Sequence, residues 1–279
     1  MIRHALMLGA ATLALQAPTF RTGIEIVTVD VSVTRGDTPV HGLTSNDFVV
    51  MDNGVPQHID SISAAQIPLS VTLVLDTSGS VAGERLASLI NASQLALNEL
   101  RANDSVALVT FASVVSRPVA LTTNVDTARS ALQLLTGAGF TTLRDAVFLA
   151  LETAPHNATR PLLLVFTDGL DTSSWLSEEE LLDAARRTDA VIHAISIGSQ
   201  PMLKQLSHET GGRTWSASSN RDLQKLFIRA IRDMRDRYVL TYTPVGVNRP
   251  EWHALNVKLV HQNGEVVARP GYWATRSLR

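Results

Sequence analysis

The sequence predicts an α/β protein with a doubly wound, mainly parallel sheet, inserted into a small β-sandwich formed by the N- and C-terminal arms. Between residues 68 and 237, apolar strand-like runs alternate with segments of helical periodicity. Residues 20–67 and 238–279 instead show period-two alternation and turn signals. Neither arm alone has enough strands for a stable core, so we expect the two arms to build one sandwich.

Residues 1–19 are interpreted as an export signal. Arg3 supplies a positive start, and the apolar run from Ala5 to Leu15 is too short to span a bilayer. A buried N-terminal helix remains the alternative. The absence of cysteine excludes disulfides, thiolate metal sites and a lipid-bearing N-terminal cysteine. We therefore expect an exported protein, periplasmic or secreted, with no membrane span after the signal is cleaved.

The composition is that of an ordinary globular protein. Hydrophobic residues make up 45% of the chain, and the formal net charge is −2. A chain this close to neutral gives no electrostatic reason to expect nucleic-acid binding. Aromatic residues make up only 5%, too few to suggest platforms for stacking bases.

The N-terminal arm begins with a predicted half-buried strand. Val27, Val29, Val31 and Val33 alternate with polar residues across residues 23–34. Further along, Asp52-Asn53-Gly54 separates two strand-like runs and predicts a hairpin.

The C-terminal arm, residues 238–279, also reads as β structure. A strand is expected at residues 238–243, and residues 255–259 alternate between apolar and polar. Asn263-Gly264 is typical of a two-residue hairpin turn.

The central segment is expected to alternate strands and helices. Strands are predicted at residues 71–75, 105–111, 161–168 and 190–197, and helices at 83–101, 127–135, 145–153, 178–188 and 221–236. Ser177 and Glu180 form a capping-box pattern at the start of the fourth helix. His193, inside an apolar strand, is interpreted as a satisfied core histidine. The Arg/Asp mixture of residues 229–237 is interpreted as a solvated helix face.

Oxygen-bearing side chains gather where the predicted strands end. Asp76, Ser78 and Ser80 follow the first strand, and Asp168 ends a later one. The loop at residues 137–145 offers Thr141 or Thr142. In an open α/β sheet, ligands bind beyond the carboxyl ends of the strands. These side chains are therefore expected to face one site.

Carboxylates and hydroxyls without His or Cys form a hard-oxygen set. Such a set suits Mg²⁺, Mn²⁺ or Ca²⁺ and disfavours zinc and copper. Two aspartates balance the charge of a divalent cation, and hydroxyls add no further charge. The ion would remain electrophilic at an open position, where a carboxylate from another protein could complete its coordination.

Three motifs carry a family resemblance. DTSGS, TTLRD and FTDG resemble the loops of the metal-ion-dependent adhesion site in von Willebrand factor type A domains, over about residues 69–236. The flanks LTSNDFVVMDNGVPQHID and YVLTYTP…VVARPGYWA are similar to the acidobacterial family of VWFA-related proteins. The resemblance implies a metal site formed by Asp76, Ser78, Ser80, Thr141 and Asp168. Gly139-Phe140 precedes the threonines where the family often has Gly-Gly, which leaves Thr141 and Thr142 both open, with Thr141 preferred.

The resemblance and the residue chemistry together favour a non-enzymatic, divalent-cation-dependent module that binds an acidic residue of a protein partner. One alternative is a scaffold with a vestigial metal site. Another is a hydrolase using Asp76 or Ser78, but no G-x-S-x-G motif is present and no histidine or lysine lies in the three loops. Asp145 is interpreted as a helix N-cap or a neighbour of the ligands, and Asp171 as a solvated rim residue.

Overall fold

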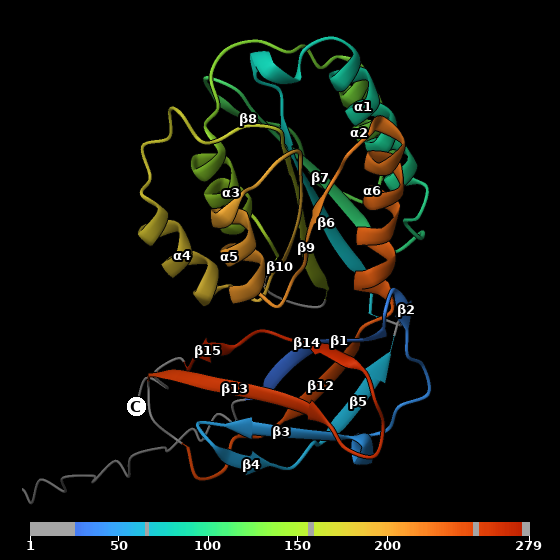
Figure 1. The fold of residues 1–279 in the computed structure, drawn as a ribbon, viewed down its shortest axis with the longest axis vertical. Helices are drawn as coiled ribbons and strands as arrows, with labels where there is room; N and C mark the ends of the chain where they lie inside the picture. Colours follow the sequence, from blue (N-terminus) through green and yellow to red (C-terminus); the bar gives the residue numbers. More distant parts are fainter. Residues whose placement is uncertain (1–25, 65–66, 156–158, 248–250, 275–279) are drawn as a thin grey trace, which may run out of the picture.

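The computed structural model describes residues 26–64, 67–155, 159–247 and 251–274. An α/β domain stacks end to end on a β-sandwich, and the chain passes from the sandwich into the α/β domain and back (Figure 1). The predicted export signal, residues 1–19, lies outside the described residues. None of the described helices is long and apolar enough to cross a membrane.

The α/β domain is built on a six-stranded mixed sheet in the order β11-β10-β9-β6-β7-β8. Its strands are β6 (Leu69–Asp76), β7 (Ser105–Phe111), β8 (Val115–Thr122), β9 (Arg160–Thr167), β10 (Val191–Ser196) and β11 (Thr214–Ser216). All neighbours pair in parallel except β7 and β8, which are antiparallel. The central strands β6, β7 and β9 are buried along their whole length, as their apolar sequences predict.

Three helices cover each face of this sheet (Figure 1). The helices are α1 (Glu84–Leu97), α2 (Val125–Gln133), α3 (Leu143–Glu152), α4 (Glu178–Arg187), α5 (Pro201–Glu209) and α6 (Asn220–Arg235). On one face α1, α2 and α6 bury residues such as Leu89, Leu132 and Phe227. On the other face α3, α4 and α5 bury Val147, Leu181 and others. The predicted doubly wound architecture is confirmed.

Three elements of this domain were missing from the sequence prediction: β8, α5 and β11. β8 is an edge strand whose side chains are mostly exposed and which contains Pro118, so it lacks regular alternation. α5 has nine residues and β11 has three, too few for a clear period.

The sandwich combines both arms of the chain in two antiparallel sheets, ordered β14-β1-β12-β5 and β15-β13-β3-β4, with the short β2 pairing to β1. Its strands are β1 (Val27–Arg35), β2 (Thr38–Pro39), β3 (Phe48–Asp52), β4 (Val55–Gln57), β5 (Ser61–Ala64), β12 (Tyr238–Tyr242), β13 (Trp252–Leu259), β14 (Glu265–Val267) and β15 (Gly271–Trp273). Short 3₁₀ turns lie at Ser45–Asp47 and Gly79–Val81. Each sheet therefore contains strands from both ends of the sequence.

One turn of the sandwich was predicted correctly and another was not. Asn53 and Gly54 both have positive φ and join β3 to its hairpin partner β4, as expected. Asn263-Gly264 does not make a hairpin, because β14 leaves β13 and pairs with β1 in the opposite sheet. The positive φ in this connection falls on His261. The segment therefore connects the two sheets of the sandwich. Leu259 before it and Val266 after it both pack against the sandwich core.

A buried polar cluster also joins the two arms. Asp52, fully buried on β3, accepts hydrogen bonds of 2.8 Å from the hydroxyls of Tyr242 and Tyr272. His253 Nδ1 lies 2.7 Å from the other carboxylate oxygen. A buried charge is costly unless it is hydrogen-bonded. The N-terminal Asp52 is thus satisfied only when the C-terminal arm is in place.

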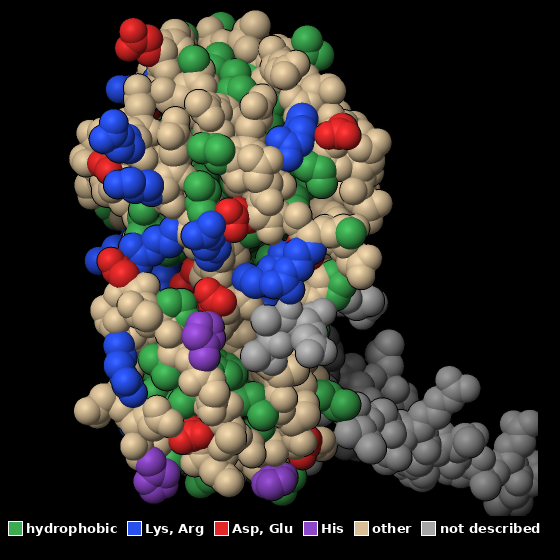
Figure 2. All heavy atoms as spheres, turned by 90° about the vertical axis from the view of Figure 1, so that its right-hand side faces the viewer, with side chains coloured by type: hydrophobic (Ala, Val, Ile, Leu, Met, Phe, Trp, Pro, Cys, Tyr) green, Lys and Arg blue, Asp and Glu red, His purple; other side chains and the backbone are tan. Residues whose placement is uncertain are grey.

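The two domains meet at a short joint, because α6 ends at Arg235 and β12 begins at Tyr238. Acidic and basic side chains gather at the level of this joint on the face that carries α6 (Figure 2). One ion pair of this region, Arg229 with Asp37 at 2.7 Å, links α6 to the β1–β2 turn of the sandwich.

Candidate metal site

The three predicted loops meet at the carboxyl edge of the α/β sheet, at the end of the domain away from the sandwich (Figure 1). Backbone bonds hold the first two together: Gly79 N donates to Gly139 O at 3.0 Å, and Ala138 N donates to Thr77 O at 2.9 Å. Glycine is needed at position 139, because its φ is 87° and a Cβ atom there would lie too close to Ser113 Oγ.

The side-chain oxygens of these loops converge. Ser78 Oγ and Ser80 Oγ are 3.1 Å apart, and Ser80 Oγ donates to Asp168 Oδ1 at 2.6 Å. A Cβ atom on Gly169 would lie 3.9 Å from both Ser80 Oγ and Thr141 Oγ1. The glycine therefore leaves open the space between the hydroxyls of two different loops.

Asp76 is the deepest member of the group and is fully buried. Burial raises the pKa of its carboxyl, and hydrogen bonds from Ser78 and Thr167 oppose that rise. Ser78 N donates to Oδ1 at 2.8 Å, and the Thr167 hydroxyl donates to Oδ2 at 2.6 Å. Sequence reasoning did not single out Thr167, although it stands inside the FTDG motif. It holds the Asp76 carboxylate in position across neighbouring strands.

The two threonines of the second loop differ in what their hydroxyls do. Thr142 Oγ1 donates to Ala112 O at 2.9 Å, and its backbone is the N-cap of α3. Thr141 Oγ1 has no hydrogen bond to another described residue, and it lies beside Gly169 with Ser80 Oγ. The geometry therefore favours Thr141 over Thr142 as the residue that faces the site.

A basic side chain reaches the same group of oxygens. The Arg85 guanidinium, from the first turn of α1, pairs with Asp168 Oδ2 and also donates to Ser80 O at 3.3 Å. The Arg85 side chain is 41% exposed, whereas that of Asp168 is 1% exposed. The positive charge of Arg85 thus neutralises Asp168, one of the two candidate carboxylate ligands.

Asp171 lies in a different environment from that expected, and of the two roles expected for Asp145 the helix N-cap is wrong. Thr142, not Asp145, caps α3; Asp145 accepts hydrogen bonds from the backbone N–H groups of Trp175 and Leu176 at 3.1 and 3.0 Å. The Asp171 side chain is 9% exposed and is therefore no solvated rim residue. It binds Arg144 and the Ser174 hydroxyl. Both aspartates fix the loop that follows β9.

The donor set fits a small divalent cation. For Mg²⁺–oxygen distances of about 2.1 Å, neighbouring oxygens of an octahedron are about 3.0 Å apart. The Ser78 and Ser80 hydroxyls, hydrogen-bonded to each other at 3.1 Å, are at a separation compatible with such an edge. No described group of three or more His, Asp or Glu is placed to hold a metal. The candidate set has two carboxylates, and its remaining ligands are hydroxyls.

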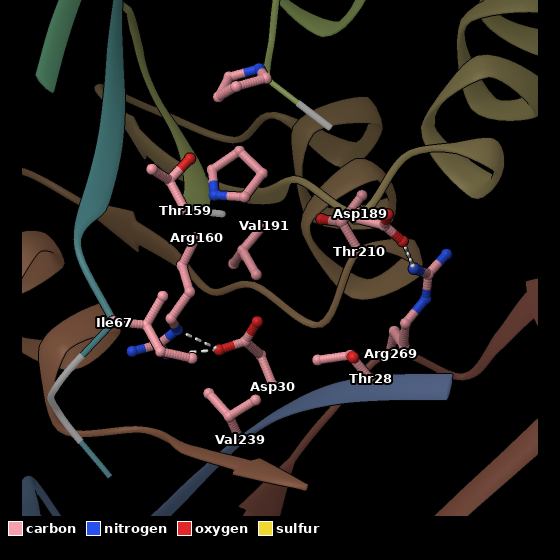
Figure 3. Close-up of a pocket in the computed structure, with 12 residues that line it drawn as sticks. Thr28, Asp30, Ile67, Thr159, Arg160, Asp189, Val191, Thr210, Val239 and Arg269 are labelled. Carbon is pink, nitrogen blue, oxygen red and sulfur yellow. Dashed lines mark hydrogen bonds and ion pairs between the residues drawn. The ribbon is translucent and has the colours of Figure 1, made fainter. Parts of the chain in front are cut away.

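A cavity of about 470 Å³ lies at the other end of the domain, between it and the sandwich (Figure 3). Its walls carry two arginines, and each faces a carboxylate: Arg160 Nε donates to Asp30 at 2.7 Å, and Arg269 lies 3.5 Å from Asp189. With these charges paired, the cavity offers no net charge to a ligand, and we assign it no site.

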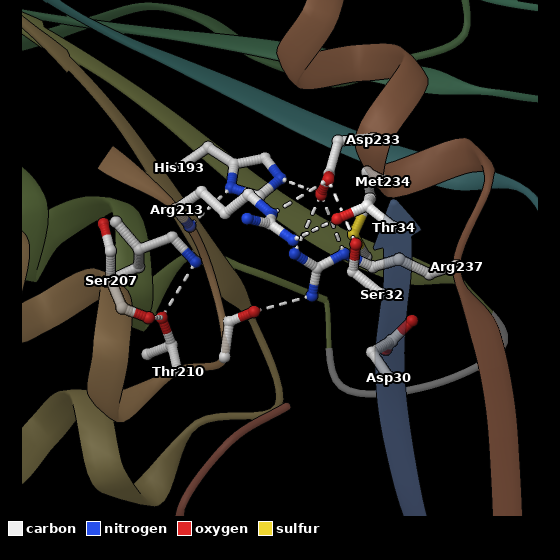
Figure 4. A network of polar contacts seen from close by, with 12 residues as sticks. Asp30, Ser32, Thr34, His193, Ser207, Thr210, Arg213, Asp233, Met234 and Arg237 are labelled. Carbon is white, nitrogen blue, oxygen red and sulfur yellow. Dashed lines mark hydrogen bonds and ion pairs between the residues drawn. The ribbon is translucent and has the colours of Figure 1, made fainter. Parts of the chain in front are cut away.

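Beside this cavity lies a buried ionic network centred on Asp233 of α6 (Figure 4). Asp233 pairs with Arg237 at 2.9 Å, Arg213 at 3.3 Å and His193 at 3.1 Å, and it accepts a hydrogen bond from Ser32 of the sandwich. The predicted solvated face of residues 229–237 is therefore wrong in its last turn, where Arg237 is fully buried and the Asp233 side chain is only 9% exposed. His193 is a buried core histidine, as predicted, but only one ring nitrogen is hydrogen-bonded: Nδ1 accepts from Arg213 N, whereas Nε2 lies 3.1 Å from Asp233 without hydrogen-bond geometry.

Comparison with known proteins bears on the α/β domain. Residues 71–171 match the family model of the von Willebrand factor type A domain. A search of curated proteins found no match. BatB from Bacteroides thetaiotaomicron is 17% identical, with a TM-score of 0.51, over 60% of this chain and 98% of its own.

Two further solved structures are similar. The vWF domain of the type V pili tip protein Mfa5 from Porphyromonas gingivalis is 14% identical, with a TM-score of 0.51, over 61% of this chain and 95% of its own. Proximal thread matrix protein 1 from the mussel byssus is 18% identical, with a TM-score of 0.56, over 66% of this chain and 51% of its own. At these identities the likeness shows the fold.

Proposed function

Because the α/β domain of this chain is a von Willebrand factor type A domain, we propose that it is an exported protein-binding module that works through a bound divalent cation. Asp76, Ser78, Ser80, Thr141 and Asp168 would hold the ion, with Mg²⁺ preferred and Mn²⁺ or Ca²⁺ as substitutes. The observation that carries the proposal is a pair of consecutive contacts: Ser78 Oγ lies 3.1 Å from Ser80 Oγ, which lies 2.6 Å from Asp168 Oδ1.

The bound cation would supply positive charge at an open coordination position, to which a partner's Asp or Glu carboxylate binds. The chain's own residues prepare that position. Thr167 and Ser78 N orient the Asp76 carboxylate, and the hydroxyls of Ser78 and Ser80 add ligands without adding charge. Two carboxylates balance the ion, so a third from a partner does not overcharge the site.

The hydrolase alternative has less support. A serine nucleophile needs a base within hydrogen-bond reach. The Ser78 hydroxyl lies 3.1 Å from that of Ser80, and no histidine among the described residues is hydrogen-bonded to it. The scaffold alternative assumes a vestigial metal site. A measurement of metal binding distinguishes it from the proposed function.

The deciding measurement is metal binding by the purified protein. Calorimetry with Mg²⁺ and electron paramagnetic resonance with Mn²⁺ should each give one ion per chain, and Asp76→Ala should abolish the signal. Asp126→Ala, whose side chain on α2 is 88% exposed, is the matched control and should bind normally. Thr141→Val should weaken binding while Thr142→Val leaves it unchanged. A wild type that binds neither ion at millimolar concentration would favour the scaffold.

Export and partner binding have separate tests. N-terminal sequencing of the protein recovered from outside the cytoplasm checks whether a signal within residues 1–19 is removed. Pull-down from the same compartment, with and without a chelator and read by mass spectrometry, identifies proteins that bind only when the metal is present. Proteins captured equally by wild type and Asp76→Ala would not depend on the site.

A further inference from the structure

Large apolar side chains crowd the loops around the candidate metal site. Of the ten such side chains that are exposed among the described residues, four stand in these loops. We call them the apolar rim: Val114 (72% exposed), Phe140 (68%), Leu170 (65%) and Trp175 (97%). A concentration of exposed apolar residues at one edge of a soluble domain marks an interaction surface.

Each rim residue is tied to the metal-site loops. Phe140 directly precedes Thr141, and its backbone N–H donates to Ser113 Oγ at 2.9 Å, next to Val114. Leu170 stands two residues after Asp168. Trp175 N donates to the Asp145 carboxylate at 3.1 Å, at the start of the helix that follows the second loop.

The backbone that carries the rim is held in place before any partner binds. Thr141 O accepts from the N–H groups of Thr172 and Ser173 at 2.9 and 3.1 Å. Asp171 accepts from Ser174 N at 3.1 Å. The bonds to Thr141 O join the loop of Leu170 and Trp175 to the loop of Phe140, and the Asp171 bond fixes the former loop internally. A surface whose backbone is already ordered loses less conformational entropy on binding, which favours affinity.

The charges next to the cation position complement an acidic partner, whereas the exposed Glu178 and Glu179 lie beyond Trp175, at the start of α4. The aspartate side chains of the loops are turned inward: Asp168 is 1% exposed and Asp171 is 9% exposed. Arg85, 41% exposed, pairs with Asp168, and Arg144, 26% exposed, pairs with Asp171. With a divalent cation bound, the surface would present positive charge surrounded by apolar side chains.

The geometry points to a specific recognition mode, which rests on the proposed function: the site binds a protein segment whose Asp or Glu stands next to a large apolar residue in the sequence. The carboxylate meets the cation, and the neighbouring apolar side chain packs on the rim, with Trp175 as its main contact. Exposed tryptophans contribute disproportionately to protein interfaces, because they bury a large rigid surface.

A peptide array tests this mode. Each peptide has a central Asp or a central Asn, flanked on either side by every combination of amino acids, and is probed with labelled full-length protein in Mg²⁺. Binding should require Asp over Asn, disappear with EDTA, and be strongest where a flanking residue is aromatic or large and aliphatic. Trp175→Ser should weaken binding to the best peptides about 30-fold and reduce the preference for apolar neighbours, while one Mg²⁺ still binds.

Val245→Ser is the matched control, since Val245 is 68% exposed on the sandwich, away from the site. It should behave as wild type. Two outcomes would refute the role of the apolar rim and leave the proposed function intact. In the first, metal-dependent binding to Asp peptides shows no preference for apolar neighbours. In the second, Trp175→Ser keeps the same preference as wild type. Apolar preference that ignores both EDTA and the Asp-to-Asn change would overturn the proposed function. An array without binding above the Asn series would count against both.

Discussion

At the scale of single residues, Arg85 reduces the negative charge of the candidate metal site. Its guanidinium pairs with Asp168, one of the two candidate carboxylate ligands. A cation bound between Asp76 and Asp168 would be repelled by this group and would compete with it for Asp168 Oδ2. Arg85 therefore opposes metal binding and stabilises the buried carboxylate when no metal is present.

We accordingly expect Arg85→Gln to bind Mg²⁺ more tightly than wild type. An ion pair at this degree of exposure is typically worth about 0.2–1 kcal/mol, so the gain in affinity should be at most about fivefold. Calorimetric titration measures it directly. Arg129→Gln, which removes an arginine that pairs with Asp126 on α2, serves as the control. Weaker Mg²⁺ binding in Arg85→Gln would mean that Arg85 supports the site.

The residue scale also shows what could be predicted from sequence. Asp76, Ser78 and Ser80 follow one strand at alternate positions, so local spacing alone predicts that they lie together. The roles of Arg85 and Asp145 depend instead on contacts with residues 83 and about 30 positions away. No local sequence pattern predicts which distant residue a charged side chain will contact in the folded sheet.

At the scale of elements, the last turn of α6 anchors the α/β domain to the sandwich. Two acidic residues of this turn differ in their surroundings. Burial alone would raise the pKa of Asp233, but Arg237 and His193 more than offset it and hold the pKa far below its usual value. Burial raises the pKa of Asp236, and the charges of His41, Arg232 and Arg101 oppose that rise only in part.

We therefore expect Asp233→Asn to be strongly destabilising. Removing one partner from a buried ionic group leaves the remaining charges uncompensated, at a cost of about 3–5 kcal/mol. Urea unfolding at pH 7, followed by circular dichroism, gives the free energy. Asp236→Asn is the matched control three residues away and should be neutral or slightly stabilising. Equal effects of the two substitutions would show that the ionic network does not hold this joint.

This turn also explains an error in the sequence prediction. Arg and Asp alternating on a helix normally indicate a solvated face, and Arg229 and Arg232 fit that interpretation with partly exposed side chains. Asp233 and Arg237 are instead withdrawn from solvent, and Asp233 contacts Ser32 of the sandwich and His193 of β10. Their burial depends on how two domains dock, which helix periodicity does not encode.

At the scale of the whole molecule, His193 links stability to pH. Burial lowers its pKa, the charges of Arg237 and Arg213 lower it further, and Asp233 opposes them. In the unfolded chain the imidazole takes up a proton below about pH 6.5, whereas burial in the folded protein disfavours the charged imidazole and lowers its pKa. The contribution of His193 is therefore present above that pH and is lost as the pH falls below it.

We expect the free energy of unfolding to fall by up to about 1.4 kcal/mol for each pH unit below about 6.5, from this group alone. His193→Gln should remove that part of the slope between pH 6.5 and 5, even if its stability is lower throughout. The control is His208→Gln on α5, where the side chain is exposed in both states, and its slope should match wild type. An unchanged slope in His193→Gln would contradict the assignment of a neutral buried imidazole.

The dependence of the sandwich on both arms gives the last prediction. β12 lies between β1 and β5, and β13 lies between β15 and β3, so both sheets lose an inner strand when the chain ends at Arg237. The remaining β1 would expose Val29 and Val31, which are fully buried in the complete chain. Unpaired edges and apolar faces of this kind promote aggregation.

A fragment of residues 20–237 should therefore aggregate or unfold non-cooperatively, as judged by light scattering and thermal unfolding. Residues 68–237 should behave better, because all six strands of the α/β sheet and both layers of helices lie within them. This comparison separates the effect of an incomplete sheet from the effect of length. The shorter fragment lacks more residues, yet it contains no sheet with missing strands. A soluble, monomeric and cooperatively folding 20–237 fragment would show that the N-terminal arm does not need the C-terminal one.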